Sequence, residues 1–129
     1  MHKKMVETAN APSAIGPYAQ AIVVENSTRS VFISGQIPLH PVTMELVSQE
    51  FSQQAQQVFK NLSAVAEGVG GSLADAVKLT VYLTDLQRFA ELNEIMSQYF
   101  EQPYPARAAV QVSALPKQVQ IEIDAVLVL

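Results

Sequence analysis

The sequence contains no cysteine. Disulfide bonds, thiolate metal sites and a cysteine nucleophile are therefore excluded, and the absence is compatible with a reducing compartment. His2 and His40 are its two histidines, which is too few for a metal site with three histidine ligands. Neither G-x-G-x-x-G nor G-K-[ST] occurs in the chain, so the sequence offers no known phosphate-binding loop.

Long apolar runs are missing as well. The first residues, M-H-K-K-M-V-E-T, are basic but are not followed by an apolar run of about seven residues or more, so we expect no signal peptide. No segment approaches the roughly 18 apolar residues of a membrane span. We therefore expect a cytoplasmic protein with no membrane partner.

Positive charge is the minority charge, with eight basic against twelve acidic residues, a net charge of −4 and a pI near 5.0. This balance disfavours a general phosphate-binding surface and leaves room only for a local basic cleft. Basic residues are also not interleaved with aromatic ones. We therefore expect no nucleic-acid partner.

The chain has 129 residues, of which 49% are apolar and 16% charged. This length suits one domain, spanning residues 1–129, that buries about two thirds of its unfolded surface. The apolar content is high enough that part of it can belong to a contact between subunits. Oligomerisation is therefore plausible from composition.

The periodicity of apolar residues predicts the secondary-structure elements. Two-residue alternation predicts strands at 18–24 and 30–36, paired as a hairpin, a short edge strand at 42–47, a strand at 77–84, and two strands joined by a proline-containing turn within 105–129. Helical spacing predicts helices from about 49 to 69, capped by Ser48, and from Asp85 towards Pro103. This order predicts an α+β fold, a mixed sheet with two helices on one face. The other face is expected to be buried against further copies of the chain, closing a ring.

The last two strands carry the first candidate site. Alternation places Arg107, Ala109 and Gln111 on one face of their strand, and Glu122 on the polar face of the next. If these polar faces coincide, a guanidinium and a carboxylate share one side of the sheet, which suits a small carboxylate ligand and an acid/base group. Spacing alone favours another interpretation, a weak cross-strand ion pair on a solvated face.

Other polar positions are equally open on pattern alone. Tyr18 at a strand entrance reads as a surface or interface aromatic, and Gly35 beside Ser34 at a strand end reads as a β-bulge. Asn93, at the margin of a helical apolar stripe, reads as a helix-surface amide.

Six segments, in order and suitably spaced, resemble the RidA/YjgF family of small enamine/imine deaminases. They are N-A-P-S-A-I-G-P-Y-A-Q, F-I-S-G-Q-I-P, Y-L-T-D-L, F-A-E-L-N, P-A-R-A-A-V-Q-V and A-L-P-K-Q-V-Q-I-E-I-D-A, spread over residues 10–126. The resemblance implies a chorismate-mutase-like fold and a homotrimer whose sheets form a central barrel, with clefts between subunits.

The resemblance also implies roles. Arg107 would hold the ligand carboxylate, Glu122 would be the acid/base group, and Tyr18, Ser34, Gly35 and Asn93 would line the cleft. Ala109 stands where most similar members have cysteine, which enlarges the pocket and leaves the substrate preference open. The implied reaction is hydrolysis of 2-iminopropanoate or 2-iminobutanoate to a 2-keto acid and ammonia, and it requires no metal or organic cofactor.

Two other functions remain open. The chain can be a regulatory trimer that binds small carboxylates without turnover. Some family members are also described as ribonucleases or translation inhibitors, which the acidic balance of this chain disfavours.

Overall fold

The computed structural model describes residues 2–129. Within this range the main elements are β1 (His2–Val6), β2 (Ala21–Glu25), β3 (Ser30–Gln36), α1 (Phe51–Gly68), β4 (Ala76–Leu83), α2 (Phe89–Met96), β5 (Ala106–Gln111) and β6 (Ile121–Val128). Short 3-10 helices at Leu73–Asp75, Leu86–Arg88 and Pro116–Gln118 precede β4, α2 and β6. In the part of the chain described here, no helix is both long and apolar enough to cross a bilayer.

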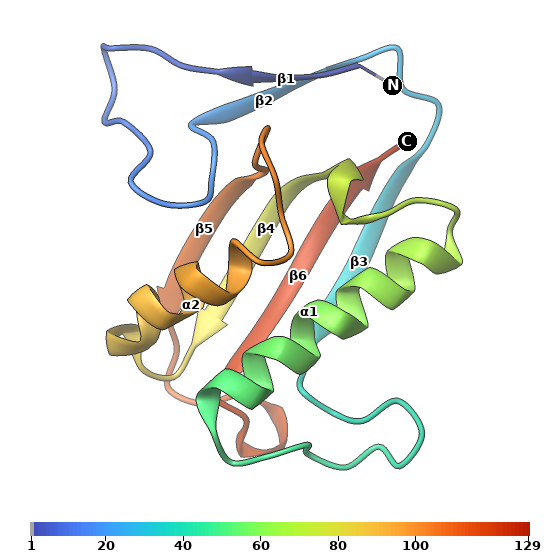
Figure 1. Ribbon diagram of the computed structural model, residues 1–129, viewed down its shortest axis with the longest axis vertical. Coiled ribbons are helices and arrows are strands. Elements are labelled where there is room, and N and C mark those ends of the chain that lie inside the picture. The colour runs from blue at the N-terminus through green and yellow to red at the C-terminus, as the bar shows by residue number, and fades with distance from the viewer. Residues whose placement is uncertain (1) are drawn as a thin grey trace.

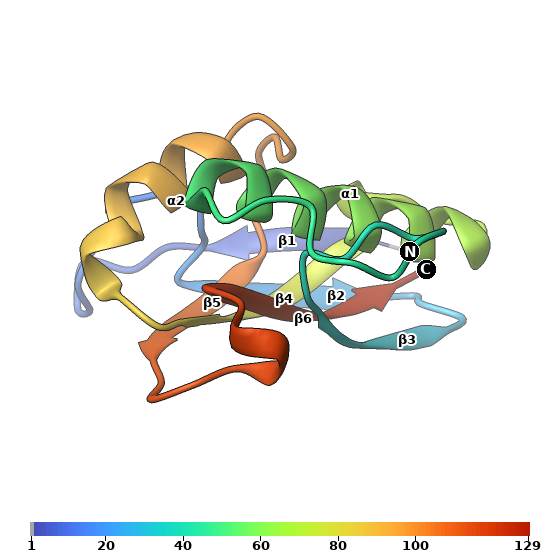
Figure 2. The same ribbon diagram turned by 90° about the horizontal axis from the view of Figure 1, so that it is seen from below.

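The main sheet has four strands in the order β3-β6-β4-β5 (Figure 1). β6 is antiparallel to both β3 and β4, whereas β5 runs parallel to β4. Both α-helices lie on the same side of this sheet, and no α-helix of residues 2–129 covers the opposite side (Figure 2). The prediction of a mixed sheet with two helices on one face is therefore confirmed.

The core lies between the sheet and the helices. Its fully buried large side chains come from α1, β4, α2 and β6, namely Val58, Phe59, Leu62, Leu79, Val81, Leu83, Leu92, Met96, Ile121, Ile123 and Leu127. Gln54 is buried with them, although its side chain is polar. Its Nε2 donates to Ser48 O (3.0 Å) and its Oε1 accepts from Gln120 N (2.8 Å), so Gln54 ties the start of α1 to the start of β6.

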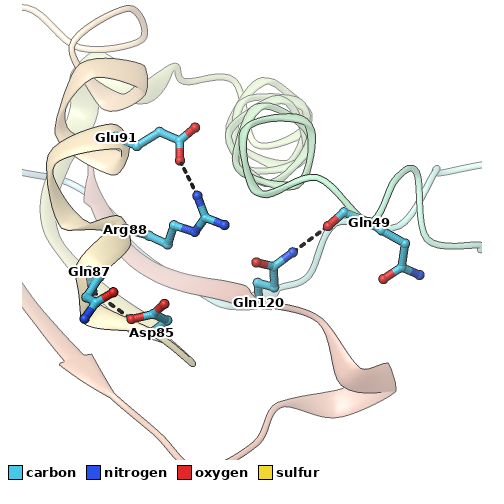
Figure 3. Close-up of polar contacts among 6 residues, drawn as sticks. All are labelled: Gln49, Asp85, Gln87, Arg88, Glu91 and Gln120. Carbon is cyan, nitrogen blue, oxygen red and sulfur yellow. Dashed lines mark hydrogen bonds and ion pairs between the residues drawn. The ribbon is translucent and has the colours of Figure 1, made fainter.

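The starts of the two helices are fixed differently. Asp85 Oδ1 accepts from Gln87 N at 2.9 Å, as predicted, although this cap opens a 3-10 turn ahead of α2 (Figure 3). The predicted cap of α1 is wrong, because Ser48 Oγ accepts from Glu50 N and α1 begins without a side-chain cap. Both helices are shorter than predicted, and α2 ends at Met96.

Surface contacts also form near the starts of α1, α2 and β6. Arg88 and Glu91 form an exposed ion pair at 3.4 Å, and Gln120 Nε2 donates to Gln49 O at 2.7 Å (Figure 3). Exposed pairs of this kind contribute little to stability. The Gln120 bond joins the segment before β6 to the segment before α1.

The N-terminal hairpin differs from the prediction. β2 pairs with β1, in register Lys4↔Val23, and not with β3, which pairs with β6 instead. Asn26 is in the left-handed region (φ 56°), and both Thr28 N and Arg29 N donate to Leu129 O, at 2.8 and 3.0 Å. The connecting segment is thus bound to the end of β6, so it does not close a tight turn between β2 and β3.

Two further strand predictions are wrong. β5 and β6 are consecutive in the chain but are separated in the sheet by β4, with which both pair. The predicted strand at 42–47 is a loop with a single bridge between Leu39 and Leu46. Met44 has a left-handed backbone (φ 61°) that interrupts strand pairing there.

Candidate active site

Arg107 lies near the start of β5 and faces the helices. It is in register with Leu79, which is fully buried in the core, so the two side chains leave the sheet on the same face. The Arg107 guanidinium carbon is 4.9 Å from the centroid of the Tyr18 ring and 5.0 Å from that of Phe89. Cation–π attraction to two rings holds this half-buried cation in place.

The edge of the guanidinium is also held. Arg107 Nη1 donates to Asn93 Oδ1 at 2.7 Å and approaches Met96 Sδ at 3.5 Å, both on α2. Gly16 packs beside this pair, since a Cβ there would lie 3.3 Å from Asn93 Nδ2 and 3.4 Å from Arg107 Nη2. The remaining guanidinium edge donates to no protein acceptor within residues 2–129.

The charge of Arg107 is not neutralised by the described chain. The ion pair found in residues 2–129 is Arg88–Glu91, and no carboxylate lies within 4.0 Å of Arg107. Burial lowers the pKa of Arg107, while the nearby Tyr18 raises it, and a guanidinium stays protonated under such shifts. A half-buried cation with free donors and no counter-ion is an anion-binding group.

Glu122 lies on the other face of the sheet. It is in register with Tyr82 of β4, and Gly35 of β3 packs against it. A Cβ at Gly35 would overlap Glu122 Oε2 and lie 2.8 Å from its Cδ, so only glycine allows this approach. The Tyr82 hydroxyl donates to Asp124 Oδ2 at 3.0 Å, and this hydrogen bond is the main cause of a raised Tyr82 pKa, followed by burial and by the charges of Asp124 and Glu122.

Ser34 and Gly35 form an irregularity in β3. The pairing with β6 shifts between Ile33 and Gln36, which is the β-bulge that the sequence suggested. Gln36 Nε2 donates to Ser34 O at 3.1 Å across it. The bulge leaves Ser34 exposed beside Gly35 and brings the backbone close to Glu122.

The predicted residues therefore form two groups within one chain. Tyr18 and Asn93 contact Arg107 on the helix face, and Ala109 packs against the core on the same face. Ser34, Gly35 and Glu122 form the second group on the open face. The condition that the polar faces of the two strands coincide is not met, so Arg107 and Glu122 do not share one side of the sheet of a single chain. β4 lies between β5 and β6, and its Leu79 and Tyr82, which register with Arg107 and Glu122, point to opposite faces.

Sequence reasoning missed several members of these groups. Phe89 and Gly16 were not among the predicted site residues, yet both enclose Arg107. Tyr82, the neighbour of Glu122, was interpreted only as a strand residue. For Phe89 a signal existed, because it lies four residues before Asn93, on the same side of a helix.

The matches to known proteins cover nearly the whole chain. The family model described as Endoribonuclease L-PSP matches residues 8–129. A RutC family protein of Pyrococcus abyssi is 48% identical over 98% of this chain and 97% of its own. The human 2-iminobutanoate/2-iminopropanoate deaminase is 45% identical over 96% of this chain and 88% of its own. The crystal structure of RidA from a Psychrobacter species is 50% identical and matches with a TM-score of 0.76 over 98% of this chain and 99% of that chain.

The chain belongs to the RidA/YjgF family. Both its mixed sheet and its two helices match the solved RidA fold. Among the curated relatives, several between 38% and 45% identical are named as imine deaminases, whereas the Pyrococcus abyssi protein at 48% carries only a family name. Membership therefore fixes the fold and leaves the activity of this chain to be argued from its residues.

Proposed function

We propose that this protein is a hydrolytic deaminase of 2-iminopropanoate and 2-iminobutanoate, the imines formed from 2-aminoacrylate-type enamines. The observation that carries the proposal is Arg107, whose half-buried guanidinium has two aromatic neighbours and no carboxylate partner in the described chain. A planar 2-imino acid carboxylate matches the free edge of such a group. Relatives named 2-iminobutanoate/2-iminopropanoate deaminase support the same substrate class.

The site is proposed to be shared between two copies of the chain. Arg107 and Glu122 leave the sheet on opposite faces, so a ligand of a few atoms cannot touch both within one chain. The open face also exposes apolar side chains, with Phe32 78% and Val110 43% exposed, and neither α1 nor α2 covers it (Figure 2). Packing of this face against another copy would bury them. A homotrimer with chorismate-mutase-like packing and a central barrel, as the family resemblance implies, is the proposed assembly.

Arg107 would fix the substrate. Its free donors bind the carboxylate through charge-assisted hydrogen bonds, which places the neighbouring imine carbon at a set position. Asn93 accepts from Arg107, so its role becomes that of a positioning residue for the guanidinium. Tyr18 supplies a ring face to Arg107, and its hydroxyl accepts from Ile15 N at 3.3 Å, which leaves the O–H free to donate to substrate or water.

Glu122 of the other copy would move protons. Its carboxylate takes a proton from a water molecule as the water oxygen forms a bond to the imine carbon. The tetrahedral adduct receives that proton on nitrogen. Glu122 then carries the remaining hydroxyl proton to the nitrogen as the C–N bond breaks and the C=O bond forms, so a 2-keto acid and ammonia leave. Water alone performs this hydrolysis slowly, and a positioned acid/base group typically accelerates a step by about 10² to 10⁴. Ser34 and Gly35 form the wall beside Glu122, and Ala109 lies two residues from Arg107 on the same face.

The proposal is tested by coupling the purified protein to a threonine dehydratase with semicarbazide as the trap for free imine. We expect less semicarbazone in its presence, and Arg107→Ala should behave like no enzyme. Arg88→Ala is the matched control, because Arg88 is an exposed arginine paired with Glu91. Unchanged semicarbazone with the wild-type protein would refute deamination. If 2-ketobutyrate nevertheless bound at Arg107, the function would be carboxylate binding without turnover.

A further inference from the structure

A cavity of about 510 Å³ lies between α1 and the segment that follows β3. Its walls include Ile37, Leu39 and Met44 on one side, and Lys60, Ala64 and Val65 of α1 on the other. Neither Arg107 nor any residue that contacts its guanidinium is among the lining residues. Its volume is in the range of small-molecule sites.

The wall opposite α1 is held in place by hydrogen bonds. Asn61 Nδ2 donates to Ile37 O (3.2 Å) and to Leu39 O (3.1 Å), while Asn61 Oδ1 accepts from Gln57 Nε2 (2.8 Å). The helix thereby fixes the loop backbone at the distance that opens the cavity. Binding there requires little ordering of the protein, which favours affinity.

Most of the lining is hydrocarbon or thioether. Met44 of the loop is 60% exposed and Val65 of α1 is 38% exposed, although both side chains are large and apolar. Ile37 and Leu39 continue this apolar surface inward, and Ala64 lies on its exposed side. Apolar walls that remain exposed gain from covering by an apolar ligand.

The cavity offers hydrogen-bond donors from Lys60 and His40, beside the side-chain amides of Gln36, Gln57 and Asn61. Lys60 Nζ has no carboxylate within 4.0 Å among residues 2–129, and no aspartate or glutamate lines the cavity. His40 Nδ1 accepts from Val42 N (3.1 Å) and Thr43 N (3.3 Å), so the ring proton of neutral His40 is on Nε2, as a donor. An ammonium and an imidazole N–H beside apolar walls match an anion with a hydrocarbon body.

We propose that this cavity binds an apolar monocarboxylate, with its hydrocarbon chain on the Met44 and Val65 walls and its carboxylate at Lys60. The site lies within one chain and is separate from the Arg107 group. It goes beyond the proposed deamination and does not depend on it. Gly35 also lines the cavity and packs against Glu122, so the two sites share one residue and need an experiment that separates them.

Hexanoate is the probe, titrated into ¹⁵N-labelled protein and followed by NMR. We expect saturable shifts at residues 35–44 and 57–65, weaker binding of the uncharged hexanamide, and no saturation by acetate, which lacks the hydrocarbon chain. Lys60→Met should weaken hexanoate binding by about fivefold or more, the scale of one exposed charge contact. Lys4→Met, at an exposed lysine of β1, is the matched control and should leave the affinity unchanged.

Two more variants separate the sites. Ala64→Phe should fill the cavity and abolish the shifts while semicarbazone removal persists, because Ala64 lies on the exposed side of α1. Arg107→Ala should lose deamination and keep hexanoate binding. Three results would each overturn the proposal. The first is a loss of the hexanoate shifts in Arg107→Ala, and the second is equal affinity for hexanoate and hexanamide. The third is unchanged hexanoate affinity in a folded Lys60→Met variant. Failure of deamination alone would leave it standing.

Discussion

Arg107 and Glu122 lie on opposite faces of one four-stranded sheet. Arg107 registers with Leu79 on the helix-covered face, and Glu122 registers with Tyr82 on the open face. A small ligand held by both must therefore lie between two copies of the chain. In the proposed function this relationship would tie catalysis to assembly, so changes on the open face should alter activity even where they touch no ligand.

Arg107→Lys should lower kcat/KM by about 10- to 100-fold, chiefly through KM. Lysine keeps the charge, but it loses the planar fork that binds a carboxylate with two hydrogen bonds and stacks between Tyr18 and Phe89. Steady-state kinetics in the coupled trap assay measure the effect. Equal kinetics for lysine and arginine would show that carboxylate geometry is not what Arg107 supplies.

Asn93→Asp should raise KM by at least about tenfold with a smaller change in kcat. The new carboxylate would stand 2.7 Å from Arg107 Nη1 and would neutralise the cation that the substrate needs. Asn93→Ser removes the amide without adding charge and is the matched control, with a smaller increase in KM expected. A larger loss in Asn93→Ser than in Asn93→Asp would contradict the role of Arg107 as a free cation.

Gly35→Ala should lower kcat by about tenfold or more and change KM little. The added methyl group would displace the Glu122 carboxylate, and small misplacements of a catalytic group are costly. Gly68→Ala is the control, because a Cβ there meets nothing within 4 Å at the end of α1. That variant should keep full activity and gain about 0.5 kcal/mol in the free energy of unfolding. A Gly35→Ala enzyme with the wild-type kcat would contradict the assignment of Glu122 as the acid/base group.

The pKa of Tyr82 should lie above the ordinary value of 10.0, because its hydroxyl donates to Asp124. A phenol whose folded pKa is raised contributes stability that is fully present below pH 10.0 and is lost as the pH rises through the folded pKa. Ultraviolet titration of the phenolate, compared between wild type and Tyr82→Phe, isolates this group. Asp124→Asn should lower the Tyr82 pKa again, and a Tyr82 that ionises below 10.0 in the wild-type protein would exclude the hydrogen bond.

Phe32→Asp should convert the oligomer towards monomer and abolish deamination together. Phe32 is 78% exposed on the open face, where a carboxylate would be buried by another copy. Val42→Asp, at a loop residue with 82% exposure, is the control and should change neither property. Molecular mass from light scattering measures assembly. An unchanged mass in Phe32→Asp would show that this face is not the contact.

Local signals in the sequence predicted local structure well. Asp85 caps the turn before α2, and the alternation that predicted a strand at 77–84 places Leu79 of β4 in the core. Each of these features depends on residues within a few positions of one another, so the pattern alone contains the information.

Long-range pairing could not be read from the pattern. Consecutive strands are usually neighbours, yet β4 separates β5 from β6, and β3 pairs with β6 and not with β2. The face of Arg107 was misjudged for the same reason. A cation on an edge strand looks solvated in sequence, whereas Phe89 and Tyr18, brought from α2 and the N-terminal loop, cover it. The family resemblance located the candidate residues, but only the strand order shows that they form two groups.

Subunit complementation tests the shared site most directly. Arg107→Ala and Glu122→Gln chains, each inactive alone, are unfolded, mixed in equal amounts and reassembled, and semicarbazone removal is then measured. If each site takes Arg107 from one chain and Glu122 from its neighbour, random trimers regain about a quarter of the wild-type rate per site. A mixture no more active than the two variants separately would contradict a site built between copies of this chain.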